Sequence, residues 1–248
     1  MTIQEYLNNP MGKGSSALML STIRQSLNPQ YEQLSSRMSV KWYSLNDNLY
    51  IAHVKIPSRK HDQLFYDVLL QFDISTVTSY TINDATMRIF SNCPSFTYTY
   101  AYVYNERNEL IDWLRSKYNK DILKKRPENR NPDQILNYER SIYLACKYLS
   151  ANSRNYVSRI KATAVTTKNT RIILSEVRTN DEIETLYQQY SASIKKEKNT
   201  EPNKTQTTKP SPKTKSGSGV KPPHRTKTTK KTSKTSTTRH TKSVKKSN

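Results

Sequence analysis

Residues that could carry catalysis are few in this chain of 248 residues. Cys93 together with His53 or His61 could supply a thiol nucleophile and its general base, as in a thiol-dependent enzyme. His53 lies in a predicted strand, where we expect a half-buried side chain with its hydrogen bonds satisfied. His61 lies in a charged loop, where we expect it to be solvated. Nothing in the spacing brings these residues together, so we expect no enzyme activity, and a thiol-dependent enzyme is the least favoured alternative.

Two further patterns do not meet the requirements of the sites that they suggest. The loop at residues 12–16 reads Gly-Lys-Gly-Ser-Ser, but a P-loop needs an upstream Gly and a Ser or Thr directly after its Lys. No Gly precedes this loop, and Gly follows its Lys. Cys93 and Cys146 lie far apart in the chain without histidine support, so they form no metal-ligand cluster. We therefore expect a connector at residues 12–16, no metal and no cofactor.

The strongest chemical signal is the charge of the C-terminal segment. Residues 195–248 hold 17 Lys and Arg against 2 Asp and Glu, so they contribute +15 of the net charge of +21. After Glu201 there is no acidic or aromatic residue, and Val220 and Val244 are almost the only apolar side chains. Such a segment cannot bury enough apolar surface to offset roughly 1–2 kcal/mol of backbone entropy per ordered residue. We expect residues 195–248 to be a disordered, basic, low-complexity tail.

The composition of this tail indicates its partner. Lysine is a flexible point charge that suits phosphate backbones, whereas base reading favours arginine on a rigid scaffold. We therefore predict that the tail binds nucleic acid, with DNA the expected form, without sequence preference. An anionic membrane surface, an acidic protein or no specific partner are the alternatives. The predicted nucleic-acid-binding residues are Lys213, Lys215, Lys221, Arg225, Lys227, Lys230, Lys231, Lys234, Arg239, Lys242, Lys245 and Lys246.

Tyrosine is the other unusual feature, because all 17 tyrosines lie before residue 195. In residues 96–104 the aromatic residues alternate, which fits a strand, but Pro94 directly before them also fits the start of a helix, and periodicity leaves both open. Tyr98, Tyr100 and Tyr102 could stack on the bases of a single strand, although a core position is the commoner one for tyrosine. An accessory single-strand-binding protein is therefore the alternative function.

The elements that must position these residues indicate an α+β fold. We expect residues 1–194 to form a single domain, with helices packed on a mostly antiparallel sheet. Alternation predicts a hairpin of two strands, 40–45 and 49–57, around the polar turn 46–48. Two more strands are predicted within residues 64–74 and around residues 87–90.

Helices are predicted mainly from capping residues and apolar spacing. A short helix is expected at residues 3–7, and Asn-Pro at residues 28–29 predicts a helix start with apolar positions up to Met38. An apolar stripe predicts a helix over 110–118. Asn-Pro-Asp at residues 131–133 predicts the start of a helix that continues to Leu149, and Thr179 opens a last helix with a capping box. Residues 159–167 and 170–177 are predicted to form a hairpin.

The expected location follows from what the sequence lacks. Two cysteines exclude a disulfide framework and favour a reducing compartment. The N-terminal ten residues are polar and no run approaches the ~20 apolar residues of a membrane-spanning helix. We expect a protein that is neither secreted nor transmembrane.

The central segment resembles a SWIM-like module of tailed-bacteriophage structural proteins. Residues 93–98 read Cys-Pro-Ser-Phe-Thr-Tyr, and Tyr102 and an Arg-Asn-Pro at residues 130–132 follow. The module has a Cys-x-Cys-Pro-x-Phe-x-Tyr segment, then Asn-Pro, then Cys-Lys-His on a helix, and these bind zinc. The resemblance covers about residues 88–150.

This chain departs from the module at the zinc ligands. Ser91 stands at the first cysteine position, and Tyr-Glu-Arg at residues 138–140 stands at Cys-Lys-His. Only Cys93 of the four ligands remains, so the resemblance implies a metal-free relative. It also implies a non-enzymatic structural protein of a bacteriophage, in the virion or the host cytoplasm, that contacts other structural proteins of an assembly.

Overall fold

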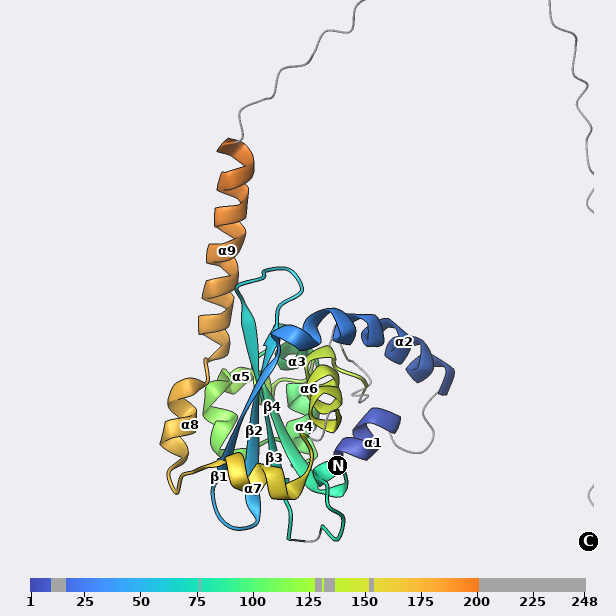
Figure 1. The fold of residues 1–248 in the computed structure, drawn as a ribbon. Helices are drawn as coiled ribbons and strands as arrows, with labels where there is room; N and C mark the ends of the chain where they lie inside the picture. The colour runs from blue at the N-terminus through green and yellow to red at the C-terminus, as the bar shows by residue number, and fades with distance from the viewer. Residues whose placement is uncertain (10–16, 76, 128–130, 132–136, 152–153, 201–248) are drawn as a thin grey trace, which may run out of the picture. The chain divides into compact units, whose positions relative to one another are not determined.

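The chain folds into helices packed on a mixed sheet. The computed structural model describes residues 1–9, 17–75, 77–127, 131, 137–151 and 154–200 (Figure 1). Residues 1–202 form one compact unit, and the second unit, residues 203–248, lies outside the described residues. The predicted α+β class with a mostly antiparallel sheet is confirmed. The predicted disorder of the tail concerns residues that the structure does not describe, apart from 195–200, which are helical.

Five strands form the sheet in the described part of the chain, in the order β4-β3-β2-β1-β5. The strands β1 to β4 pair antiparallel, and β5 pairs parallel with β1. Asn46 closes the predicted turn between β1 and β2, because its Oδ1 accepts hydrogen bonds from the N–H groups of Asn48 (2.9 Å) and Leu49 (2.8 Å). All four predicted strands are confirmed. The bounds are β1 Ser39–Ser44, β2 Leu49–Pro57, β3 Phe65–Asp73, β4 Thr86–Ser91 and β5 Val165–Thr166.

Helices occupy most of the remaining described residues. The α-helices are α1 Ile3–Asn8, α2 Ala17–Leu34, α3 Pro94–Thr99, α4 Ala101–Glu106, α5 Lys120–Lys124, α6 Arg140–Ser150, α7 Val157–Thr163, α8 Thr170–Glu176 and α9 Asn180–Thr200. The 3-10 helices are η1 Ser35–Arg37, η2 Ile82–Asp84 and η3 Asp112–Lys117. The predicted first and last helices are confirmed as α1 and α9.

Helices cover both faces of the sheet. Tyr43, Ile51 and Gln71 pair across neighbouring strands and so share one face. On that face Tyr43 bonds to Glu176 of α8, and Trp113 of η3 donates to Gln71 (3.2 Å). On the opposite face α6 packs on β2 and β3, and α1 and α2 pack on α6 (Figure 1). This double cover explains why β2 and β3 are buried along almost their whole length.

Most of the tyrosine excess is used in the core. Tyr6, Tyr43, Tyr104 and Tyr143 are among the largest fully buried side chains. A buried tyrosine hydroxyl needs a partner, and the Tyr6 hydroxyl accepts a hydrogen bond from the backbone N–H of residue 139 (2.9 Å). Tyr6, Tyr43 and Tyr143 therefore act as packing residues with a polar anchor, whereas the buried Tyr104 hydroxyl has no hydrogen-bond partner among the described residues.

The predicted helix start at residues 28–29 is wrong. Pro29 lies inside α2, and Leu27 is buried in the core. Asn28 does not cap a helix; its Oδ1 accepts hydrogen bonds from the Tyr143 hydroxyl (2.8 Å) and Lys147 Nζ (2.6 Å) of α6. Packing of α2 on α6 outweighs the cost of an interior proline, which is about 3 kcal/mol.

The helix predicted to start at residues 131–133 begins later, at Arg140. Residues 132–136 lie outside the described residues, and the buried Asn131 donates through Nδ2 to the carbonyl of Thr99 (3.2 Å). Glu139 caps α6, because its Oε2 accepts from the N–H of Ile142 (3.0 Å). The sequence gives no common capping residue at this point, since Glu is an unusual N-cap. The predicted buried face of this helix comprises Ile135, Leu136, Ile142, Tyr143, Cys146 and Leu149. The last four are buried, as predicted, and Ile135 and Leu136 lie outside the described residues.

The hairpin predicted for residues 159–177 is also wrong. The segment forms α7 and α8 with only the two-residue strand β5 between them. Asn169, which was expected at the turn, caps α8 by accepting at Oδ1 from the N–H of Arg171 (2.9 Å). The β-branched residues of this segment have only a weak strand preference, and their packing environment overrides it.

The open choice for residues 96–104 is decided in favour of helix. Pro94 occupies the first turn of α3, and α4 follows directly. The helix predicted for residues 110–118 is replaced by the shorter η3, because Leu110 forms a bridge with Ile89 beside β4.

Candidate nucleic-acid interface

The twelve predicted nucleic-acid-binding residues, from Lys213 to Lys246, lie outside the described residues. The helix that precedes them, α9, is fixed to the body by its first turn. Thr179 and Glu182 form the predicted capping box, with the Thr179 N–H donating to Glu182 Oε2 (2.5 Å) and the Glu182 N–H donating to Thr179 Oγ1 (3.2 Å). Asn180 is buried and donates through Nδ2 to Thr97 Oγ1 (2.6 Å).

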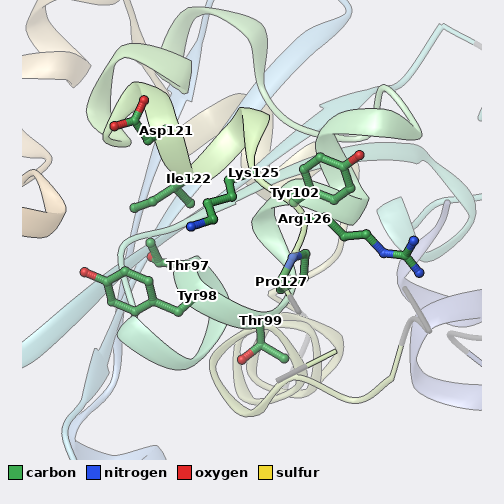
Figure 2. Close-up of a pocket in the computed structure, with 9 residues that line it drawn as sticks. All are labelled: Thr97, Tyr98, Thr99, Tyr102, Asp121, Ile122, Lys125, Arg126 and Pro127. Carbon is green, nitrogen blue, oxygen red and sulfur yellow. The ribbon is translucent and has the colours of Figure 1, made fainter. Parts of the chain in front are cut away.

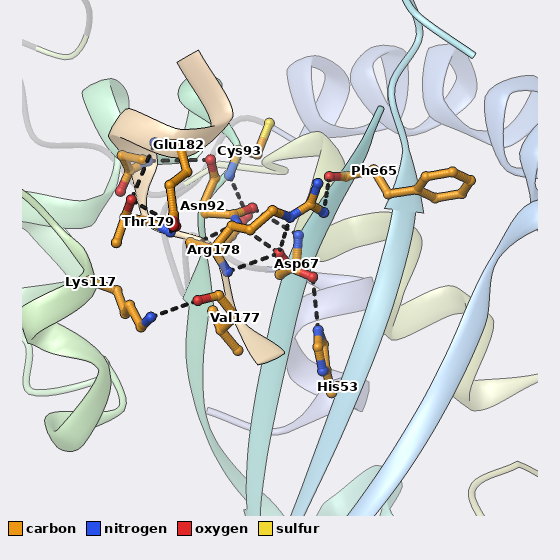
Figure 3. Close-up of polar contacts among 12 residues, drawn as sticks. His53, Phe65, Asp67, Asn92, Cys93, Lys117, Val177, Arg178, Thr179 and Glu182 are labelled. Atoms are coloured by element: carbon orange, nitrogen blue, oxygen red, sulfur yellow. Dashed lines mark hydrogen bonds and ion pairs between the residues drawn. The ribbon is translucent and has the colours of Figure 1, made fainter. Parts of the chain in front are cut away.

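A buried polar cluster holds the segment just before α9 against the sheet (Figure 3). Asp67 of β3 lies within hydrogen-bond distance of His53 Nε2 through Oδ1 (2.9 Å) and of Arg178 Nε through Oδ2 (3.2 Å). Asn92 Nδ2 also donates to Asp67 Oδ2 (3.0 Å), and an Arg178 terminal nitrogen donates to the carbonyl of Phe65 (2.6 Å). The cluster therefore joins β2, β3 and the entry to α9.

The chemistry of this cluster favours structure over catalysis. Burial by itself would raise the pKa of Asp67, but the hydrogen bond from His53 and the charges of His53 and Arg178 lower it below its ordinary value. Both carboxylate oxygens are occupied by donors within the protein. His53 has a satisfied Nε2, as predicted, but it is fully buried and not half-buried. Sequence reasoning missed Asp67 and Arg178, which lie far apart in the chain.

Of the other catalytic candidates, Cys93 directly follows Asn92 of this cluster (Figure 3), and His61 lies against α9. Cys93 and Cys146 are free and buried. Burial, with a smaller effect of Glu139, raises the pKa of the Cys93 thiol to about 12, which makes it a poor nucleophile. His61 was predicted to be solvated, and this is wrong: it is buried against α9, with Nε2 3.2 Å from Ser191 Oγ and its ring 4.8 Å from the Tyr187 ring.

The three predicted stacking tyrosines differ in position. Tyr98 on α3 is 36% exposed, and its hydroxyl bonds to the Glu184 carboxylate. Tyr102 on α4 is partly buried and, together with Tyr98, lines one pocket. Tyr100 lies between the two helices, packs against the core, and has a pKa raised to about 12 by burial and by Glu139. Tyr98 and Tyr102, from the consecutive helices α3 and α4, thus line the same pocket, whereas Tyr100 between these helices does not line it.

Basic residues border the same pocket (Figure 2), which has a volume of about 210 Å³. Lys125 and Arg126, directly after α5, line it opposite α3 and α4. In Figure 2 the Lys125 side chain points toward the space beside Tyr98 and Ile122, whereas Arg126 points away from Tyr98. Proteins that bind single strands use aromatic side chains to stack on bases and nearby cations to contact phosphates. The sequence signal missed here is the run of three basic residues at 124–126.

Of the four positions where the resemblance would place zinc ligands, Ser91 and Cys93 are hydrogen-bonded to each other and Arg140 lines a cavity together with Cys93. The fourth, Tyr138, packs against Tyr6 and Tyr143. Ser91 Oγ lies 2.9 Å from Ser141 Oγ, Ser141 donates to Glu139 Oε2 (2.6 Å), and the Cys93 N–H donates to Ser91 Oγ (3.1 Å). These contacts form a hydrogen-bonded cluster at the end of β4 and the start of α6. The described residues contain no group of three or more His, Cys, Asp or Glu that could hold a metal ion.

Comparison of the chain with protein-family models, with curated proteins and with solved structures found no match. The resemblance to a SWIM-like phage module therefore stays a prediction. Among the helices of the described part, none is both long and apolar enough to cross a membrane.

Proposed function

We propose that this protein binds nucleic acid without sequence preference through the basic residues that follow Glu201. The single observation that carries the proposal is that these residues include 14 Lys and Arg and no Asp or Glu. Each phosphate that a Lys or Arg neutralises releases counterions, so a segment of this kind binds phosphate backbones by charge alone.

The charge distribution supports placing the affinity in this segment and not in the body. Residues 1–194 hold 24 Lys and Arg against 18 Asp and Glu, a net charge of only +6. We further propose that the body is the structural part, which docks on other proteins of a bacteriophage assembly. This second part rests on the resemblance of residues 88–150 alone.

Removal of the basic segment tests the proposal. In the described part of the chain all buried core side chains lie between Ile3 and Ile183, so ending the chain after Pro202 removes none of them. We expect the shortened chain to lose binding to duplex DNA in a mobility-shift assay. With about six to ten phosphate contacts, the full chain should lose roughly 10³–10⁵ in affinity between 50 and 200 mM salt. Equal binding by the two chains would refute the proposal.

A matched pair of full-length variants separates charge from length. The first replaces Lys227, Lys230, Lys231 and Lys234 by Gln, and the second replaces the neighbouring Thr226, Thr228, Thr229 and Thr232 by Ser. The Gln variant should bind DNA more weakly than the Ser variant, which should match the original chain. An equal effect of both changes would count against charge as the cause.

A second candidate function is single-strand binding by the pocket of Figure 2, where Tyr98 and Tyr102 lie beside Lys125. Here Tyr102→Ala in the chain that ends at Pro202 should weaken binding to single-stranded DNA, since stacking contributes about 1–3 kcal/mol per base. Tyr80→Ala is the control, because Tyr80 is 88% exposed and does not line this pocket. No difference between the two variants would eliminate this candidate.

A further inference from the structure

A second, larger cavity of about 540 Å³ lies where the β2–β3 connection, α3, the start of α6 and α9 meet. Three basic residues line it: Arg59, Lys60 and Arg140. Three tyrosines also line it: Tyr66, Tyr98 and Tyr187. Its volume is within the range of small-molecule sites, roughly 300–1,000 Å³.

Arg140 is the central cation of this cavity. Its side chain is half-buried, and its hydrogen bonds go to neutral oxygens, from Nε to Gln30 Oε1 (2.8 Å) and from a terminal nitrogen to the carbonyl of Pro57 (3.5 Å). None of the ion pairs between described residues includes Arg140. A cation withdrawn from water is normally paired with an anion, and among the described residues this guanidinium forms no such pair.

Arg59 is a second guanidinium in the lining of this cavity. Burial lowers the pKa of Arg140, Cys93 and Glu139 oppose this shift, and repulsion from Arg59 adds to it to a smaller extent. The Glu139 carboxyl is used elsewhere, since its Oε2 accepts from Ser141 Oγ (2.6 Å), and burial raises its pKa. The guanidinium groups of Arg59 and Arg140 thus lie close enough to repel each other. The nearby Glu139 carboxylate is bonded to Ser141.

Lys60 completes the basic wall. Its Nζ donates to the Tyr187 hydroxyl (3.2 Å) and lies 5.7 Å from the centre of the Tyr187 ring. Both contacts direct the ammonium group over α9, and none of the ion pairs within the described part of the chain includes Lys60. The one acidic residue that lines the cavity is Glu184, whose carboxylate bonds to the Tyr98 hydroxyl. The lining therefore carries three positive charges and one negative charge.

The tyrosines indicate that the ligand of this cavity is more than a simple anion. Tyr66 is largely buried beneath the cavity, while Tyr98 and Tyr187 are only partly covered. Aromatic faces favour a flat, partly apolar group, and base–aromatic stacking accepts every base. An inorganic phosphate would use the cations but leave the aromatic walls without contacts.

We propose that this cavity binds a nucleotide, with its phosphate at Arg140, Arg59 and Lys60 and its base against the tyrosines. The nucleotide is either free or one unit of a single strand, since both present the same phosphate and base. This site lies in the body and is separate from the basic segment after Glu201.

Calorimetric titration of the full-length protein with nucleoside 5′-monophosphates tests the site. Arg140→Gln should lower the affinity about tenfold or more, as for loss of a hydrogen bond to a charged group. Because Arg140 also contacts Gln30 and Pro57, thermal unfolding must verify that this variant is folded. Lys60→Gln, an exposed change, should lower the affinity about twofold to fivefold. Lys161→Gln and Arg171→Gln should leave the affinity unchanged, because both residues are exposed and line neither of the two cavities described.

Three further titrants define the ligand. Inorganic phosphate and the unphosphorylated nucleosides should both bind more weakly than the monophosphates. Binding of an oligothymidylate but not of monophosphates, with the same sensitivity to Lys60→Gln, would assign the site to a strand and still support it. The proposal would be overturned if neither the monophosphates nor the oligothymidylate bound more tightly than inorganic phosphate, or if the Lys60 and folded Arg140 variants bound these ligands as tightly as the original protein does.

The site and the basic segment can fail separately. The full-length variant with Gln at Lys227, Lys230, Lys231 and Lys234 should bind monophosphates as the original protein does. Suppose that this variant still binds duplex DNA as tightly as the original protein, and that Lys60→Gln weakens monophosphate binding. DNA binding through the residues after Glu201 would then be refuted, and nucleotide binding in the cavity would be supported.

Discussion

The carboxylate of Asp67 is the most heavily used polar group of the buried interior. It lies against His53, Asn92 and Arg178, which come from three different segments of the chain. A buried charge of this kind is tolerated only when its hydrogen bonds are complete, and loss of one partner leaves the others uncompensated. The cluster thus makes the position of the entry to α9 dependent on one side chain.

Asp67→Asn should therefore destabilise the protein strongly. We expect a loss of about 3 kcal/mol in the free energy of unfolding at neutral pH, measured by urea denaturation. Asp62→Asn is the matched control, because the Asp62 side chain is 91% exposed and its pairing with Arg37 lies at the surface. Similar losses in the two variants would show that the buried Asp67 carboxylate stabilises the protein no more than the exposed Asp62 carboxylate does.

The stability difference between the original protein and Asp67→Asn has a defined pH dependence. The pKa of Asp67 in the folded protein is lower than in the unfolded chain, where it is about 3.9. Its contribution is complete above the unfolded pKa and is lost as the pH falls through the lower folded pKa. The stability difference between the original protein and Asp67→Asn should therefore be constant at neutral pH and shrink in acid. A difference that grows in acid would contradict the lowered pKa.

Single residues were predictable from the sequence only where their environment is local. The capping box of Thr179 and Glu182 depends on a spacing of three residues and could be identified directly. The burial of His61 could not, because it depends on contact with Ser191 and Tyr187 at the other end of the chain. The same limit applies to the basic cavity, which combines residues from four separate segments.

At the level of elements, the strands were easier to predict than the helices. The hairpin of β1 and β2 is a local structure whose turn is closed by Asn46. The helices α2 and α6 are held together by contacts between residues in their interiors, such as the bonds from Tyr143 and Lys147 to Asn28. Capping statistics placed their starts at Asn-Pro pairs, and packing placed them elsewhere.

The end of α4 provides a test at this scale. Asn108 has a φ of 56°, and the N–H groups of Asn108 and Glu109 donate to the carbonyls of Asn105 (3.0 Å) and Tyr104 (2.9 Å). This pattern is a Schellman motif, in which the left-handed position favours Gly or Asn. We expect Asn108→Ala to lower the free energy of unfolding by about 1 kcal/mol relative to Asn108→Gly. Both changes remove the bond from Arg115 to Asn108 Oδ1, so the comparison isolates the backbone, and equal stabilities would contradict it.

At the scale of the whole molecule, folding and charge are assigned to different parts of the chain. The core of the described part ends at Ile183, whereas most of the net charge follows residue 194. Sequence composition was sufficient to predict this division, because it depends on the presence or absence of apolar residues and not on three-dimensional contacts. The position of each tyrosine in the core, by contrast, required the fold.

This division predicts how salt and substitution act together. Each phosphate contact contributes about −0.9 to the slope of log affinity for duplex DNA against log salt concentration. If Lys227, Lys230, Lys231 and Lys234 all contact phosphates, their replacement by Gln should make the slope less steep by about 3 to 4. The free energy of unfolding should stay unchanged, since these residues follow the compact unit that ends at Pro202. An unchanged slope with a lower stability would mean that these lysines support the fold instead of the DNA contact.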